Sequence, residues 1–150
     1  MVSDRPLQVL LVEDNPADVR LTTEVLRDAT TRNELHVTRD GVEALDYLHQ
    51  RGEFSDVGRP DFVILDLNMP RKDGREVLAE MHGDADLRAI PVAVLTTSTL
   101  EADIVQSYEL GANCFLAKPV DLDEFFALVK ALDTFWLGMV RLPPDPGDQP

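Results

Sequence analysis

The chain has 150 residues, of which 44% are hydrophobic and 28% charged, so we expect one soluble globular domain and no second domain of ordinary size. Its 28 acidic and 14 basic residues give a formal net charge of −14, which disfavours direct binding to nucleic acid or to an anionic membrane surface. No apolar run reaches the ~18 residues of a membrane span and Met1 begins no signal-peptide core, so the sequence predicts a cytoplasmic protein.

Strand-like and helix-like segments alternate along the chain. Short apolar runs bounded by turn formers predict five strands, at residues 7–12, 35–38, 62–65, 90–95 and 112–117. Apolar side chains at helical spacing predict five helices, at residues 16–27, 42–51, 77–83, 100–110 and 122–137. Asn15 and Asp121 are the expected N-caps of the first and last helix. The alternation predicts a three-layer α/β domain, in which helices cover both faces of a parallel sheet.

The two ends of the chain differ in character. We expect the folded domain to occupy residues 1–137 and the proline-rich segment 138–150 to be a disordered tail.

Cys114 is the only cysteine, which excludes an internal disulfide and a cysteine-based zinc site. Its apolar surroundings predict a buried, inert thiol.

Polar side chains follow four of the predicted strands at the point where each strand ends. They are Glu13, Asp14, Asp66, Asn68, Thr96 and Lys118. The carboxyl ends of strands in open α/β sheets are where ligands bind. If the first and third strands are neighbours, their carboxylates crowd together, and two charges about 4 Å apart repel by about 4 kcal/mol at an effective dielectric of 20. Mg²⁺ relieves this repulsion and suits the side chains of Asp14 and Asp66 with the backbone carbonyl of Asn68.

Lys118 and Thr96 indicate that an anion binds beside this metal. An ammonium and a hydroxyl that converge on a metal-bound carboxylate suit the oxygens of a phosphoryl group, whose transfer depends on positioning and charge neutralisation. Carboxylates are known nucleophiles that form aspartyl phosphates. Asp66, on the central strand, is the expected phosphoacceptor.

Four short blocks resemble the signature blocks of the response-regulator receiver domain of two-component signalling. They are Leu-Val-Glu-Asp-Asn-Pro at 11–16, Leu-Asp-Leu-Asn-Met-Pro at 65–70, Leu-Thr-Thr-Ser at 95–98 and Lys-Pro at 118–119. The blocks occur in order, and the resemblance extends over residues 7–137. It implies a doubly wound (βα)5 sheet of order 2-1-3-4-5, as in flavodoxin-like folds.

The same resemblance implies a chemical role for the residues at the strand ends. Asp66 would accept a phosphoryl group from a phosphohistidine on a sensor histidine kinase. Glu13 and Asp14 would hold Mg²⁺, although members of the family commonly carry two aspartates at these positions. Lys118 would pair with the phosphate and precede a cis peptide bond to Pro119.

The resemblance also implies how the signal leaves the domain. Thr96 and Phe115 would be switch residues that move when the phosphate arrives. The predicted function is a single-domain response regulator, which is a phosphoacceptor signalling protein and not an enzyme, and which signals through protein contacts. The amino-acid sequence at residues 12–21, 70–78 and 110–115 resembles, more narrowly, that of the stand-alone receivers that serve phytochrome-type histidine kinases.

Two other functions stay open at this point. A haloacid-dehalogenase-like phosphatase also uses a strand-end aspartate and Mg²⁺, but such enzymes have Asp-x-Asp where this chain has Asn68 in the second place. A receiver-like interaction module that no longer takes phosphate is the other alternative. The complete set of strand-end residues argues against it.

The last predicted helix carries more apolar residues than one helix face can bury. One stripe at helical spacing consists of Leu122, Phe125, Val129, Leu132 and Trp136, with further apolar residues outside it. One interpretation is a wide core stripe, extended by a tail that folds back. The other is a symmetric homodimer interface through the fourth helix, fifth strand and fifth helix. The candidate residues for this interface are Ile104, Tyr108, Phe126 and Phe135.

Overall fold

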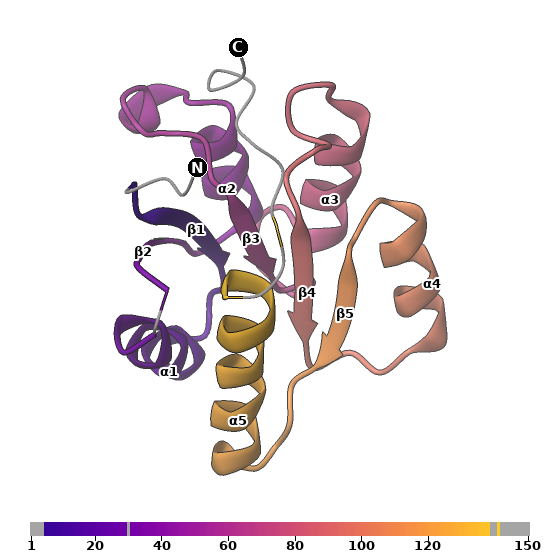
Figure 1. Cartoon of the computed structure of the whole chain (residues 1–150). Coiled ribbons are helices and arrows are strands. Elements are labelled where there is room, and N and C mark those ends of the chain that lie inside the picture. Colours follow the sequence, from indigo (N-terminus) through magenta and orange to yellow (C-terminus); the bar gives the residue numbers. More distant parts are fainter. Residues whose placement is uncertain (1–4, 30, 139–140, 142–150) are drawn as a thin grey trace.

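Five parallel strands form one sheet in the order β2-β1-β3-β4-β5 in the computed structural model, which describes residues 5–29, 31–138 and 141 (Figure 1). The strands are β1 (Leu7–Val12), β2 (Asn33–Thr38), β3 (Phe62–Leu65), β4 (Val92–Thr96) and β5 (Cys114–Ala117). The helices are α1 (Pro16–Arg27), α2 (Gly41–Leu48), α3 (Gly74–Gly83), α4 (Glu101–Glu109) and α5 (Leu122–Leu132). A 3₁₀ turn, η1 (Gly52–Phe54), follows α2, and a π-helical turn, η2 (Asp133–Leu137), continues α5. The predicted α/β class and strand order are confirmed.

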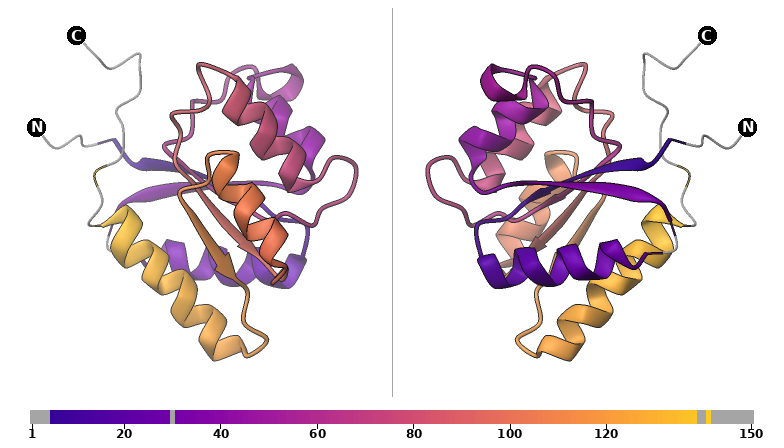
Figure 2. Two further views of the ribbon diagram at one scale, coloured as in Figure 1. Left: turned by 90° about the vertical axis from the view of Figure 1, so that its right-hand side faces the viewer. Right: turned by 90° about the vertical axis from the view of Figure 1, so that its left-hand side faces the viewer.

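Helices cover both faces of this sheet (Figure 2). On one face, α1 and α5 pack against side chains of the central strands such as Val9, Phe62 and Ile64. On the other face, α2 and α3 pack against alternating neighbours such as Leu10 and Val63. Every residue of β3 and β4 is buried, which explains why these strands are continuous apolar runs in the sequence. In the part of the chain that the structure describes, no helix combines the length and apolar character that a membrane crossing requires.

Polar side chains fix the starts of four helices. The Asn15 side chain accepts hydrogen bonds from the backbone N–H groups of Ala17 and Asp18, and the Asp121 side chain accepts one from Glu124 N. Both predicted N-caps are therefore confirmed. Asp40 and Asp73 cap α2 and α3 in the same way.

Strand starts are the least accurate part of the predicted fold. β2 begins two residues earlier than predicted, while β4 and β5 begin two residues later. Ile90 and Ala112 are buried, but they precede the strands. Pro91 has no N–H to donate to a neighbouring strand. The Asn113 side-chain oxygen accepts a hydrogen bond from Val92 N at 2.8 Å, so a side chain replaces a backbone partner there.

The apolar stripe of α5 is only partly in the core. Phe125, Val129 and Leu132 are buried against the face covered by α1 and α5. Leu122 is 69% exposed and does not fit the core-stripe interpretation, because the first turn of α5 extends past the ends of the strands (Figure 1). The tail that the core-stripe interpretation folds back on this helix lies mostly outside the described residues, at 139–140 and 142–150.

The peptide bond before Pro119 is trans, as no described residue has a cis bond. The cis bond that the family resemblance implied is therefore wrong for this structure. The two isomers of an X–Pro bond differ by only about 0.5–1 kcal/mol, so the presence of a proline does not determine which isomer forms.

Candidate functional site

The carboxyl ends of β1, β3, β4 and β5 meet at one edge of the sheet, where backbone hydrogen bonds continue past the strands. Asp66 N donates to the Val12 carbonyl at 3.0 Å, and Lys118 N donates to the Thr96 carbonyl at 2.7 Å. These bonds fix the first residue after each strand relative to its neighbour. The structure thus brings Glu13, Asp66 and Lys118 together, as the sequence predicted.

The Lys118 ammonium lies at the centre of this group. Its Nζ donates to Glu13 Oε2 at 2.6 Å, to Asp18 Oδ2 at 2.8 Å and to Asp66 Oδ2 at 2.9 Å. The Lys118 side chain is only 4% exposed. Burial alone would lower the pKa of Lys118, but the hydrogen bonds to Asp18, Glu13 and Asp66, together with the charge of Glu13, outweigh it and raise that pKa. The lysine therefore stays charged and neutralises part of the acid cluster.

Glu13 is one of the two buried carboxylates of the cluster. Its burial raises its pKa from 4.5 to about 7, with a further contribution from the charge of Asp66 and an opposing one from Lys118. One lysine is therefore insufficient to compensate the carboxylates around it. The excess negative charge favours a bound cation.

Glu13, Asp14 and Asp66 together form a candidate metal centre. Each offers a carboxylate oxygen, and these oxygens lie within 4.8 Å of one another. Asp14 is exposed while the other two are buried, so the group opens to solvent on one side. Three hard oxygen donors with room for water suit a divalent cation such as Mg²⁺ or Mn²⁺. For Asn68, the structure gives a hydrogen bond from its N–H to Asp66 Oδ1 at 3.1 Å, and its carbonyl as a metal ligand stays a prediction.

Thr96 is fully buried at the end of β4, next to the acids. Its Oγ1 accepts a hydrogen bond from the Asn68 side-chain amide at 3.3 Å and lies 3.4 Å from Ser98 N. Thr96 is therefore linked on one side to the loop that carries Asp66 and on the other to the loop before α4. The switch role of Thr96 stays a prediction. We refer to Glu13, Asp14, Asp18, Asp66, Thr96 and Lys118 as the strand-end site.

Phe115, the second predicted switch residue, lies on β5 and is half-buried. It packs against the core on the α2 and α3 face, and its backbone N–H donates to Tyr108 Oη at 3.2 Å. In the sheet register Phe115 lies opposite Val94, while Thr96 lies opposite Ala117. Its switch role stays a prediction.

An ion pair that the sequence analysis missed ties the loop after Thr96 to α3. Arg75 donates twice to the carboxylate of Asp103, at 3.1 and 2.8 Å, and the Ser98 hydroxyl donates to the same carboxylate. The Arg75 and Ser98 bonds lower the pKa of Asp103. Residues 75 and 103 are too far apart in sequence for a pattern of charges to reveal the pair.

Asp18 is the member of the strand-end site that sequence reasoning missed. The amphipathic pattern of the first helix assigned it to the water-facing side. In the structure its carboxylate is only 21% exposed and contacts Lys118. No spacing within the helix reveals this contact, because Lys118 lies one hundred residues further along the chain.

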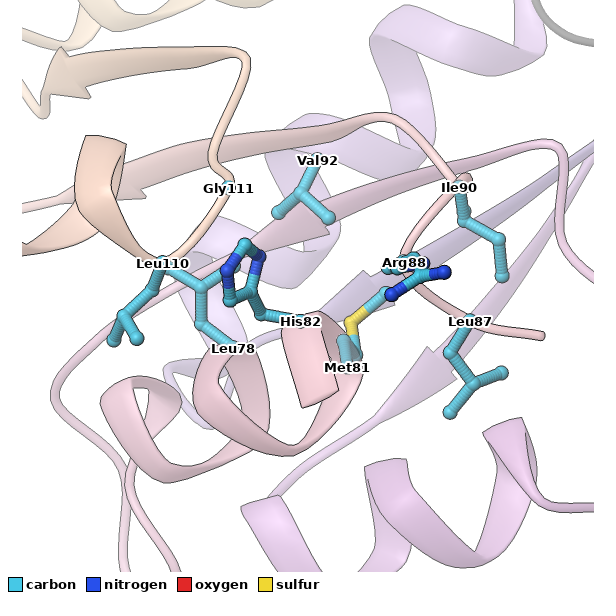
Figure 3. A pocket seen from close by; sticks show the side chains of 9 residues that line it. All are labelled: Leu78, Met81, His82, Leu87, Arg88, Ile90, Val92, Leu110 and Gly111. Atoms are coloured by element: carbon cyan, nitrogen blue, oxygen red, sulfur yellow. The ribbon is translucent and has the colours of Figure 1, made fainter. Parts of the chain in front are cut away.

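The hollow in Figure 3 lies away from the strand-end site. It is lined by α3, by the segment that leads into β4, and by Leu110 and Gly111 before β5. These segments lie at the amino ends of the strands, whereas the strand-end site lies at the carboxyl ends. The side chains around the hollow are mostly apolar, such as Leu78, Met81 and Ile90. The hollow has no part in the chemistry of the carboxylates.

A doubly wound sheet with carboxylates from two strands, a lysine and a threonine at one edge defines a metal-binding α/β domain of the receiver type. Residues 9–130 match the response regulator receiver domain family. The chain therefore belongs to the response regulator receiver domain family. Members of this family are signalling proteins, so the phosphatase alternative is not supported.

Named relatives and solved structures agree with this assignment. Response regulator Rcp1 of Synechocystis sp. is 50% identical over 141 residues, which cover 94% of this chain and 96% of Rcp1. A crystal structure of the Mn²⁺-bound form of Rcp1 is similar with a TM-score of 0.91 at 50% identity, covering 93% of this chain and 100% of that one. A crystal structure of the phosphorylated cyanobacterial phytochrome response regulator RcpA has a TM-score of 0.90 at 48% identity, with the same coverage.

These comparisons confirm two of the predictions made from sequence. The chain is a response regulator receiver, and it resembles the phytochrome-linked receivers in particular. Receiver domains bind a divalent metal, and the Glu13, Asp14 and Asp66 cluster is suited to one.

Proposed function

We propose that this receiver takes a phosphoryl group from a phosphohistidine of a sensor histidine kinase onto Asp66 and signals through protein contacts. The observation that carries the proposal is the position of the Asp66 carboxylate. One of its oxygens accepts from Asn68 N at 3.1 Å and the other accepts from Lys118 Nζ at 2.9 Å. This carboxylate is buried at the strand end, yet it adjoins the solvent-facing Asp14.

The residues around Asp66 supply what phosphoryl transfer requires. An Asp66 oxygen forms a bond to phosphorus while the bond between phosphorus and the histidine nitrogen of the donor breaks. Lys118 has three N–H donors that can turn from carboxylates to the phosphoryl oxygens, and the Thr96 hydroxyl can donate to another of those oxygens. Mg²⁺, held by Glu13, Asp14, Asp66 and the Asn68 carbonyl, would neutralise charge on the transferred group.

Thr96 is suited to pass the event on to the loop before α4. In this structure its Oγ1 accepts from the Asn68 amide, and its O–H could donate to a phosphoryl oxygen at Asp66. A shift of Thr96 would move Ser98 and the ion pair behind it. Phosphorylation would thereby bias an existing equilibrium between two arrangements of this face, with Phe115 as the second switch residue.

The partner we propose is a phytochrome-type histidine kinase. Support comes from the 48% identity to the phosphorylated phytochrome response regulator RcpA, which extends over 93% of this chain. The cytoplasm is the proposed compartment, as expected from the sequence.

Mass spectrometry after incubation with acetyl phosphate and Mg²⁺ tests the phosphoacceptor. We expect one phosphoryl group on the parent chain and none on Asp66→Asn. The matched control is Asp56→Asn, which changes an exposed aspartate on the loop before β3 and should be modified like the parent. A parent chain that binds Mg²⁺ but takes no phosphate would instead identify a phosphate-insensitive interaction module.

We also propose a homodimer through α4, β5 and α5. All the large apolar side chains that the described residues expose lie in this part of the chain, and they include Tyr108 at 50%, Phe126 at 48% and Phe135 at 54%. Ile104, the fourth candidate, is half-buried on α4. β5 is an edge strand of the sheet, so nothing on its outer side separates α4 from α5.

A further inference from the structure

Lys118 makes three contacts with carboxylates, and these contacts are not equivalent. Glu13 and Asp66 also belong to the candidate metal centre, where their oxygens lie within 4.8 Å of an Asp14 oxygen. Asp18 is not part of that centre. A bound cation therefore competes with Lys118 for two of its partners and leaves the third one unaffected.

We propose that Asp18 is a positioning residue that holds the Lys118 ammonium beside Asp66 while a metal occupies Glu13 and Asp66. The proposal rests on the function proposed above, since it concerns the same site. It assigns a residue outside the four sequence blocks to the working of the lysine.

The start of α1 fixes Asp18 for this task. The Asn15 side chain accepts hydrogen bonds from Ala17 N at 2.9 Å and from Asp18 N at 3.2 Å, so the backbone of the first turn is held. From this turn the Asp18 carboxylate reaches Lys118 Nζ at 2.8 Å. The contact spans one hundred residues of sequence, and the Lys118 side chain at its far end is 4% exposed.

The charges around Lys118 give the expected sign for metal binding. With Asp18 present, the ammonium keeps a partner when it gives up Glu13 and Asp66 to the cation. Without Asp18, the ammonium has only those two partners and competes harder for them. Removal of one negative charge near the cation weakens metal binding in the same direction.

The geometry gives the expected sign for phosphoryl uptake. One N–H of Lys118 stays on Asp18, and the other two are free to point at oxygens of the incoming group. Without Asp18, the ammonium has no fixed position once the metal is bound. Loss of a positioning contact lowers the rate even when metal and donor are saturating.

The test compares Asp18→Ala, which removes both the charge and the hydrogen-bond acceptor, with the parent in two measurements. One is Mn²⁺ affinity by electron paramagnetic resonance, and the other is the rate of uptake from acetyl phosphate as a function of Mg²⁺ concentration. We expect about fivefold weaker Mn²⁺ binding and a plateau rate at least about threefold lower. Glu24→Gln makes the same change of charge on the exposed side of α1 and should alter neither quantity.

The two measurements separate positioning from charge. If Asp18→Ala weakens Mn²⁺ binding but leaves the plateau rate unchanged, Asp18 acts only through its charge and the proposal is overturned. It is equally overturned if neither quantity changes. Asp18→Glu keeps the charge but moves it outward, so we expect near-parental Mn²⁺ affinity with a reduced plateau. Failure of the parent chain itself to become phosphorylated would count against the proposed function, and the Mn²⁺ affinities would still report on Asp18.

Discussion

At the scale of single residues, Glu13 shows that a negative charge in the strand-end site is unfavourable without a bound cation. Its carboxylate is 2% exposed and lies beside both Asp66 and Lys118. Burial raises its pKa to about 7, so without metal this carboxyl group keeps its proton to a higher pH in the folded chain than in the unfolded chain. The site is thus prepared for a cation by the fold itself.

The raised pKa of Glu13 predicts a pH dependence of stability in the absence of metal. A carboxyl group whose pKa is higher in the folded state stabilises the fold below its ordinary value of 4.5, and this contribution is lost as the pH rises through about 7. Between about pH 5 and pH 8, the free energy of unfolding of the parent minus that of Glu13→Gln should therefore decrease by on the order of 2 kcal/mol. Urea unfolding in the presence of a chelator measures this difference.

The difference between the two chains isolates Glu13, because the remaining acids are common to both. Saturating Mg²⁺ should reverse the sign of the slope, since the metal must displace the proton and then favours higher pH. A parent-minus-variant difference that stays constant or grows with pH without metal would show that Lys118 already compensates Glu13 fully.

At the scale of elements, the loop between β3 and α3 carries Asp66, the proposed phosphoacceptor, and depends on a glycine. Gly74 begins α3, and its N–H donates to the Leu67 carbonyl at 2.8 Å. A Cβ at this position would lie 2.1 Å from the Asp66 carbonyl oxygen and 2.7 Å from Leu67 Cα. Both atoms belong to the backbone, so the loop itself would have to move.

Gly74→Ala should therefore destabilise the fold and misplace Asp66 together. We expect a loss of about 2–3 kcal/mol in the free energy of unfolding, as for an overpacked buried position, and a slower uptake from acetyl phosphate. The control is Gly58→Ala, since a Cβ at this exposed glycine meets no atom within 4 Å. Its free energy of unfolding should stay within about 0.5 kcal/mol of the parent. Equal urea midpoints for the two variants would contradict the close approach at Gly74.

The elements also show which parts of the structure the sequence could predict. Asp66 was identifiable because it ends a continuous apolar run, and the position of a charge at a strand end follows from topology alone. Asp18 was not identifiable, because the pattern of one helix cannot show that Lys118, which follows β5, approaches the polar side of that helix. The core-stripe interpretation of the last helix fails at Leu122, because helical spacing carries no information about where the sheet ends. The isomer of the bond before Pro119 depends on tertiary context, as does the Arg75 and Asp103 pair.

At the scale of the whole molecule, the distribution of apolar surface is asymmetric. The large apolar side chains exposed among the described residues all belong to the stretch from Leu100 to Phe135. The rings of Phe135 and Trp136 meet edge-on, with their centroids 6.0 Å apart. The ring of Trp136 in turn packs against that of the core residue Phe62, with a centroid distance of 5.5 Å. The patch is therefore continuous with the rigid core, which suits a docking surface better than a loose one would.

The proposed dimer predicts that a charge on this patch separates the two copies. Phe126 is exposed on α5, and a symmetric interface would contain it twice, so Phe126→Lys should raise the dissociation constant at least about tenfold. Ala79→Lys places the same side chain on the exposed side of α3, which packs on the opposite face of the sheet, and should leave association unchanged. Because each chain carries a formal charge of −14, added salt should strengthen the parent dimer by screening the repulsion between copies. Sedimentation equilibrium at micromolar concentration, with and without acetyl phosphate, measures the dissociation constants of the parent and of both variants, and the effect of salt on the parent. A parent chain that sediments as a monomer in both states would reject the interface and leave these aromatic side chains for a different partner protein.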